Sequence, residues 1–169
     1  MKELKFDHVF NCDEDTYWDK VFFAEDYNQA MFVDTLKFNR WKLVSSEDGD
    51  DKLERVVEVD PPVGDIPKTV KKVIGDNFGY RELGTFDKKT KRYTVNVKTN
   101  VMGDKMRING EIWLEPAGEK KVRRHAKFNV DVKIFGIGKV VEGLIARDMQ
   151  SQFEEGSAFT NTWIADKGL

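Results

Sequence analysis

The sequence has few of the residues that usually carry chemistry. Cys12 is the only cysteine, and His8 and His125 are the only histidines among 169 residues. A single cysteine excludes an internal disulfide and a cysteine metal cluster. A glycine-rich phosphate loop and the HExxH, CxxC and GxSxG motifs are also missing. We therefore expect no metal, no cofactor and no catalytic residue set of a familiar type.

Long hydrophobic runs and a strong charge of one sign are missing as well. No apolar run approaches the roughly 18 residues that a transmembrane helix requires. The first ten residues, MKELKFDHVF, alternate and carry charges, which is typical of a strand and not of a signal peptide, so we expect a cytoplasmic protein. The net charge of -2 gives no reason to expect a nucleic acid partner. Hydrophobic residues make up 40% and charged residues 34%, which predicts one soluble globular domain, 1–169.

The last third of the chain carries the clearest pattern. Residues 122–135 alternate between apolar and polar positions, which predicts a long strand with one buried face. Gly136 and Gly138 follow, and the apolar period then changes to that of a helix of about eight turns. The apolar stripe of this helix consists of Ile137, Val140, Val141, Leu144, Ile145, Met149, Phe153, Phe159 and Trp163. A long strand that leads into a long one-sided helix suggests a sheet wrapped around that helix.

The rest of the chain supplies strands for such a sheet. A first strand around residues 4–10 is followed by two short helices, the first with Asp13 as its N-cap. Alternating segments separated by short turns then predict an antiparallel meander. Its strands are expected at 38–45, 53–60, 78–86, 92–101 and 106–115, with a short helix at 66–74. The fold class is therefore α+β, with a curved antiparallel sheet of about six to seven strands around a long C-terminal helix.

This order resembles the helix-grip fold of the START-like superfamily, which includes lipid-transfer domains, polyketide cyclases and ubiquinone-binding proteins. The resemblance covers nearly the whole chain and is carried by residues 66–76, 108–116 and 132–142. It is closest to a bacterial START-like family of uncharacterised function, from whose pattern the sequence departs at Phe86 and Phe135. The resemblance implies a cavity between the sheet and the C-terminal helix that holds a hydrophobic molecule.

Four polar residues lie on faces that are otherwise apolar. Arg55 and Arg124 interrupt the apolar parity of their strands, and Asp148 and Gln152 lie one turn apart within the apolar arc of the helix. Burying an unpaired charge costs several kcal/mol, so these groups need a partner, water or a ligand. They could orient the polar head of an apolar ligand. Alternatively, an internal pair between Arg124 and Asp148, or arginine side chains that snorkel to a strand end, would explain them.

We expect an elongated, mostly apolar cavity of a few hundred Å³ between the helix and the sheet. Gly110 removes a side chain from its wall. The apolar residues expected to line it are Tyr93, Val95, Val97, Met106, Ile108, Ile112, Phe128, Leu144 and Met149.

Three functions are compatible with this evidence, and we predict the first. It is non-covalent binding, with transport or sequestration, of a hydrophobic small molecule such as a lipid, isoprenoid or polyketide. The second is a cyclase or dehydratase in which Asp148, His8 or Tyr93 acts as acid or base. The third is a protein-interaction module with a filled core.

For the three lysines and two histidines that remain, a structural role is an alternative to a functional one. Lys68, Lys71 and Lys72 beside an apolar helix face could touch a membrane surface, but the segment is short and a solvated helix face is the favoured explanation. His125 is expected to face solvent, because it lies on the polar parity of its strand. His8 lies on the apolar parity and is expected to be a hydrogen-bonded core or cavity residue and not a base.

Overall fold

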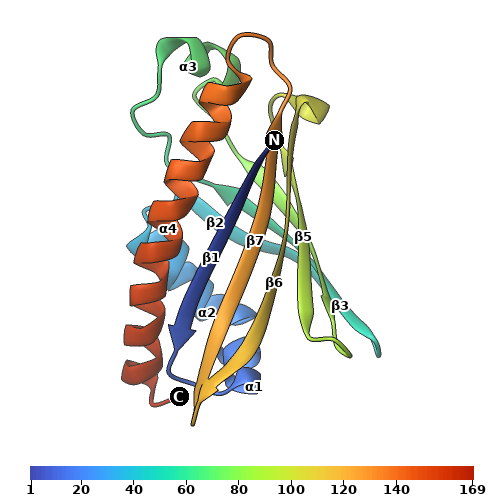
Figure 1. Cartoon of the computed structure of the whole chain (residues 1–169), viewed down its shortest axis with the longest axis vertical. Helices are drawn as coiled ribbons and strands as arrows, with labels where there is room; N and C mark the ends of the chain where they lie inside the picture. Colours follow the sequence, from blue (N-terminus) through green and yellow to red (C-terminus); the bar gives the residue numbers. More distant parts are fainter.

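A seven-stranded antiparallel sheet bends around the C-terminal helix α4 (Gly138–Lys167), as Figure 1 shows. The computed structural model describes residues 1–169. The strands are β1 (Lys2–Phe10), β2 (Arg40–Asp48), β3 (Lys52–Asp60), β4 (Tyr80–Asp87), β5 (Arg92–Thr99), β6 (Met106–Gly118) and β7 (Lys121–Val132). Their order in the sheet is β1-β7-β6-β5-β4-β3-β2, with every pair antiparallel. The predicted α+β helix-grip architecture is confirmed.

The two short helices after β1 are also present. The first is α1 (Glu14–Thr16), which continues as the π-helical η1 (Tyr17–Phe22), and the second is α2 (Glu25–Asn28), which continues as η2 (Gln29–Thr35). The carboxylate of Asp13 caps the first helix by accepting a hydrogen bond from the N–H of Thr16 at 2.8 Å. These helices lie at the end of the molecule that is opposite to α3 (Lys68–Ile74) (Figure 1).

Helix α4 packs along β1 and β7 with a narrower face than its sequence suggested. Most of its buried residues are small, among them Ala146, Gly156 and Thr160. Their small side chains let the helix lie close to its neighbours. Val141 of the predicted stripe is buried. Leu144, Met149 and Phe153 are only partly buried and face the space between the helix and the far part of the sheet. The inclusion of Val140 in the stripe was wrong, since 46% of its surface is exposed.

Two predicted strand boundaries also need correction. Strand β7 ends at Val132, and Phe135, which the alternation placed in the strand, lies in a loop with its side chain fully exposed. Strand β6 continues to Gly118, where a turn was expected, because the pairing shifts register between Pro116 and Gly118. Such a bulge lets a strand continue past a residue that cannot pair regularly.

The interior is divided into three hydrophobic clusters. One lies around Phe10, Tyr17 and Trp18, where η1 meets β1 and β7. A second lies around Val70 and Val141, beneath α3, and the third contains Trp41 and its neighbours on β2 and β3. The first two clusters share the partly buried residues Leu4, Ile108 and Met149.

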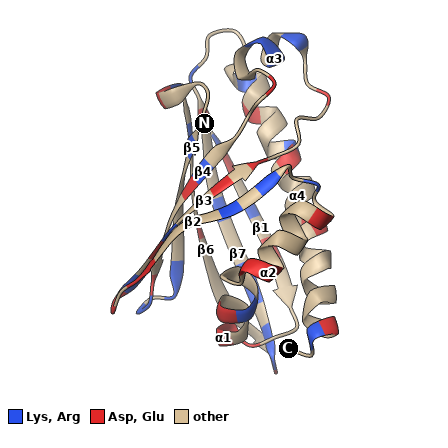
Figure 2. Ribbon diagram, turned by 180° about the vertical axis from the view of Figure 1, so that it is seen from behind, with Lys and Arg blue, Asp and Glu red and all other residues tan.

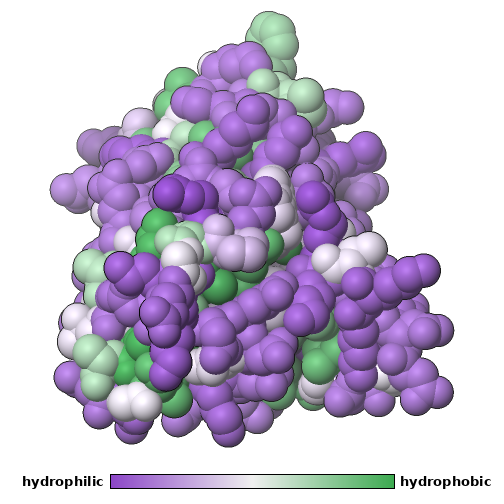
Figure 3. Space-filling view, turned by 60° about the horizontal axis from the view of Figure 1, so that its bottom comes forward, coloured by the Kyte–Doolittle hydropathy of each residue, from purple (hydrophilic) through white to green (hydrophobic).

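Charges on the outside are mixed. Figure 2 shows both positive and negative residues along β2 and β3, and it places positive residues on α3. No helix is both long and apolar enough to cross a lipid bilayer. Seen from the end that carries α1 and α2, the surface is mostly hydrophilic, and apolar residues appear chiefly in recesses (Figure 3).

Candidate functional site

The space between α4 and the curved sheet is a cavity of about 290 Å³. It is lined by 37 residues, of which 26 are hydrophobic, so its wall is mostly apolar, as predicted. The thirteen residues proposed from the sequence all lie on this wall: Arg55, Tyr93, Val95, Val97, Met106, Ile108, Ile112, Arg124, Phe128, Leu144, Met149, Asp148 and Gln152. Their role toward a ligand remains a prediction.

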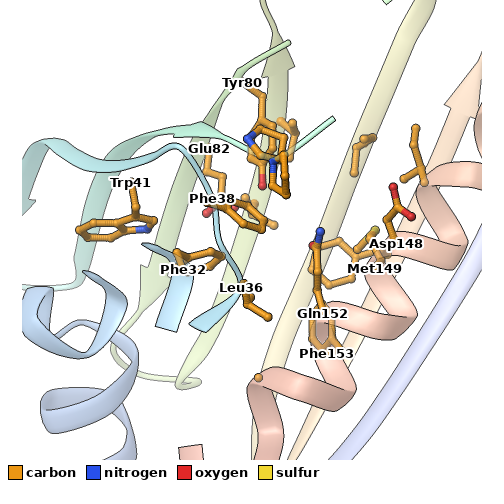
Figure 4. A pocket seen from close by; sticks show the side chains of 18 of the residues that line it. Phe32, Leu36, Phe38, Trp41, Tyr80, Glu82, Asp148, Met149, Gln152 and Phe153 are labelled. Atoms are coloured by element: carbon orange, nitrogen blue, oxygen red, sulfur yellow. The ribbon is translucent and has the colours of Figure 1, made fainter. Parts of the chain in front are cut away.

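The sequence did not indicate the far wall. Aromatic residues from η2, from β2 and from the connection between them face helix α4 across the cavity, as Figure 4 shows for Phe32, Trp41 and Phe38. The segment between β3 and β4, including Pro61 and Val70, covers the α3 end. The curvature of the sheet brings these elements opposite α4, and no local pattern in the sequence reports that curvature.

Glu82 on β4 is the charged cavity residue that the sequence reasoning missed. It lies between Tyr80 and Gly84 on the inward parity of β4, opposite Val57 of β3 and Val97 of β5. Neither a hydrogen-bond donor nor a cation of the protein pairs with its carboxyl group. Burial raises the pKa of Glu82, and the charge of Arg55 offsets part of this rise. A glutamate on an inward parity is the signal that could have identified it.

Arg55 is 7% exposed and lies diagonally across from Glu82 on the neighbouring strand. Its Nε donates to the hydroxyl of Tyr93 at 3.1 Å, and one terminal nitrogen donates to the carbonyl oxygen of Phe22 at 3.3 Å. Its guanidinium also lies 4.8 Å from the ring centre of Phe22, which is within range of a cation–π contact. Arg55 is therefore held by neutral groups and not by a carboxylate.

Two glycines allow aromatic rings to lie flat against the sheet. A Cβ at Gly84 would lie 1.6 Å from the hydroxyl oxygen of Tyr93, so only glycine lets this phenol reach Arg55. A Cβ at Gly110 would lie 2.3 Å from the ring of Phe128. The expectation that Gly110 opens space for a ligand was wrong, since the ring of Phe128 occupies that space and Gly110 is not part of the cavity wall.

Arg124 on β7 is the second arginine that faces the cavity. Its terminal nitrogens lie 3.2 Å from Nδ1 of His8 and 3.4 Å from the hydroxyl of Tyr17. Its guanidinium carbon lies 4.9 Å from the ring centres of both Phe10 and Phe153. Its Nε is buried and has no partner. Burial, and then the charge of Arg124, lower the pKa of His8, so the neutral imidazole can accept a hydrogen bond from Arg124.

The predicted pair between Arg124 and Asp148 does not form. Asp148 instead pairs with Arg147 at 2.9 Å, and about half of its side-chain surface is exposed. Adjacent residues of a helix point about 100° apart. The side chain of Arg147 bends towards its neighbour Asp148 and holds that carboxylate at the rim of the cavity. Figure 4 shows Asp148 and Gln152 projecting from α4 at the cavity, across from Phe38 and Tyr80.

The two histidines are placed as expected. His8 is partly buried and hydrogen-bonded within the interior. His125 lies on the outer face of the sheet, where its ring nitrogens contact Asp7 and, at 3.0 Å, Glu115, and it stacks on Trp113. No three His, Cys, Asp or Glu side chains are grouped so that they could hold a metal ion.

A family model described as "Protein of unknown function (DUF2505)" matches residues 5–164 of the chain. No curated protein matches it.

Solved structures with the same fold share little sequence with it. A START superfamily protein from Mycobacterium smegmatis superimposes with a TM-score of 0.58 at 10% identity, over 97% of each chain. The Zhui aromatase/cyclase from Streptomyces sp. R1128 gives 0.61 at 9% identity, over 94% of this chain and 93% of that one. Norcoclaurine synthase from Thalictrum flavum, solved with dopamine and hydroxybenzaldehyde, gives 0.61 at 16% identity, over 94% of this chain and 85% of the other. These likenesses establish the START-like fold.

Proposed function

Because this chain belongs to the DUF2505 family and folds around an apolar cavity, we propose that it binds a hydrophobic small molecule non-covalently. The ligand would be of the size and character of a lipid, isoprenoid or polyketide, and the protein would carry or sequester it in the cytoplasm. The cavity is the observation that carries this proposal.

The volume of the cavity supports ligand binding. Protein interiors normally leave few voids larger than a water molecule, because side chains that face a void lose dispersion contacts. A space of about 290 Å³ is near the lower end of the range for small-molecule sites. An apolar ligand would restore the missing contacts of residues such as Leu144, Met149 and Phe153, which are only partly buried without one. The same space argues against an interaction module with a filled core.

Binding of the neutral dye Nile red tests the proposal. A tryptophan at Leu144, on the cavity wall, should reduce dye binding by filling the space. Val140→Trp is the matched control, because Val140 lies about one turn away on the same helix, is exposed and does not line the cavity. Native mass spectrometry of freshly purified protein should also detect a co-purified apolar molecule. If the wild type neither binds the dye nor carries such a molecule, the protein-interaction module becomes the better hypothesis.

Glu82 favours an acid–base enzyme as the second candidate. An uncompensated carboxyl group with a raised pKa, inside an apolar cavity, is an arrangement that suits general acid or base catalysis. Burial also raises the pKa of Tyr80 well above its ordinary value, and the charge of Glu82 adds to the effect. Conversion of a bound ligand by the wild type but not by Glu82→Gln, with dye binding retained in both, would support this activity. Recovery of the ligand unchanged from both proteins would leave binding alone.

An exposed apolar loop next to α3 favours a brief contact with a membrane surface. The side chain of Phe135 is fully exposed, while its neighbour Ile134 packs against the cluster beneath α3. Lys68, Lys71 and Lys72 of α3 are exposed, although Lys71 pairs with Asp76 at 3.2 Å. An aromatic side chain flanked by lysines suits the interface of an anionic bilayer.

Sedimentation with phosphatidylglycerol vesicles tests this contact. Phe135→Ser should reduce the bound fraction, whereas Leu83→Ser, which alters an exposed apolar residue on the outer face of β4, should not. Equal sedimentation of the two variants would remove the membrane contact from the proposal.

A further inference from the structure

The arginines of this chain divide into three groups by partner and exposure. Arg40, Arg81, Arg92 and Arg147 each pair with a carboxylate within 4 Å. Arg107 and Arg123 are exposed and need no partner. Only Arg55 and Arg124 are withdrawn from solvent without a carboxylate within 4 Å, and both line the cavity. Withdrawing a guanidinium group from solvent without a counter-ion is costly, so their position calls for an explanation.

The two guanidinium groups lie at the same end of the cavity. Arg55 donates to the carbonyl oxygen of Phe22, and Arg124 contacts the hydroxyl of Tyr17. Tyr17 and Phe22 are the first and last residues of η1, and their rings are 6.3 Å apart. Both arginines are therefore positioned against η1, at the end of the cavity opposite to α3.

Negative charge on the cavity wall does not balance them. Glu82 is one carboxyl group, set diagonally from Arg55 and not paired with it. Asp148 is matched by Arg147 at the rim. Two guanidinium groups and one free carboxyl group leave the cavity wall with an excess of one positive charge.

We infer that the cavity takes an apolar molecule with one acidic group, such as a long-chain carboxylic acid, and that the acidic group lies at the η1 end near Arg55 and Arg124. This inference rests on the proposed ligand binding and adds the chemistry of the head group. A guanidinium has five N–H donors. Arg55 uses two of them within the protein, through Nε and one terminal nitrogen, so donors remain for a carboxylate.

The apolar part of the ligand then extends from η1 towards α3. Val95, Ile108 and Met149 line the middle of the cavity wall, and Val70 lines its α3 end. A carboxylate balances the excess charge of one, and it accepts charge-assisted hydrogen bonds from arginine, which are stronger than bonds between neutral groups.

Displacement of Nile red by three ligands with the same twelve-carbon chain tests the inference. Dodecanoic acid, dodecanol and dodecylamine differ only in the head group. For the wild type we expect the acid to bind about tenfold or more tightly than the alcohol, and the amine to bind most weakly. Arg55→Met and Arg124→Met retain an unbranched, flexible side chain and remove the guanidinium and its charge, so each should reduce the preference for the acid. Arg123→Met is the matched control, because Arg123 is adjacent to Arg124 but faces solvent on the outside of β7.

The outcomes distinguish a failure of the acidic head group from a failure of the proposed ligand binding. If Nile red and all three ligands fail to bind the wild type, the proposed function fails. If the alcohol binds the wild type as tightly as the acid, ligand binding stands and the acidic head group is refuted. A preference for the acid that survives in both methionine variants would also refute the site. Where circular dichroism shows that a variant is unfolded, the wild-type comparison of acid and alcohol decides.

Discussion

Replacement of Glu142 by glutamine tests how much the contacts of this side chain between strand β7 and helix α4 stabilise the protein. The side chain of Glu142 is 4% exposed, and its carboxylate accepts a hydrogen bond from the N–H of Val132 at 3.1 Å. It also pairs with Nζ of Lys139 and with the amino group of Met1, each at 3.1 Å. Burial by itself would raise the pKa of Glu142, but these partners outweigh it and lower the pKa from 4.5 to about 2.

The pKa of Glu142 sets both the size and the pH range of the effect. A fall from 4.5 to about 2 corresponds to about 3 kcal/mol of stability. Since the side chains of Lys139 and Met1 are largely exposed, solvent screens part of this, and we expect about 2 kcal/mol. Because the pKa is lower in the folded protein than in the unfolded chain, this stabilisation is present above about pH 5. It is lost as the pH falls from there towards 2.

Urea denaturation at pH 7 and pH 3 measures the effect. Glu142→Gln should lower the free energy of unfolding by about 2 kcal/mol at pH 7 and by clearly less at pH 3. Glu155→Gln is the control, because Glu155 is exposed on the same helix and forms no ion pair. A difference between wild type and Glu142→Gln that is equal at both pH values would refute the assignment of the low pKa to this contact.

Three further substitutions probe the packing. Leu144→Ala should cost about 1 kcal/mol in chemical denaturation, because Leu144 faces the cavity, whereas Ile164→Ala at a buried site should cost about 2–5 kcal/mol. Equal costs would show that the cavity is filled by the protein. Gly143→Ala should stabilise the helix by about 0.5–1 kcal/mol, since nothing lies within 4 Å of the added Cβ, and a lower thermal midpoint would contradict this. Asp13→Ala should cost about 1 kcal/mol through loss of the cap on Thr16, and an unchanged thermal midpoint would show that the cap contributes nothing.

Much of the fold could be predicted from local patterns, because a strand or helix that buries one face has apolar residues at a characteristic spacing. The alternation of residues 122–132 identified β7 and its inward face, including Val130 and Phe128. The same parity placed Arg55 and Arg124 inside, which the structure bears out. The pattern could not locate the end of the strand at Val132. Ile134 continues the apolar parity of the strand although it lies beyond the last paired residue, so the pattern runs past the true end.

The partners of the polar residues could not be predicted in the same way. His8 and Tyr17 lie 116 and 107 residues from Arg124, and only the pairing of β1 with β7 and the packing of η1 bring them together. The Arg124–Asp148 pair was a reasonable inference from two facing elements. It was wrong because the neighbouring Arg147 holds Asp148 at the rim.

The sequence by itself determined the order of strands and helices, the inward faces of the strands and the apolar character of the interior. Each follows from the contrast between buried and exposed residues at short spacing. Only the tertiary structure decided where the cavity lies, that Glu82 has no paired cation there and that Arg55 and Arg124 lie at the same end of it without a carboxylate. The physical reason is the bend of the sheet. It arises from the combined twist of seven strands, and it sets distances between residues far apart in the chain that no local pattern encodes.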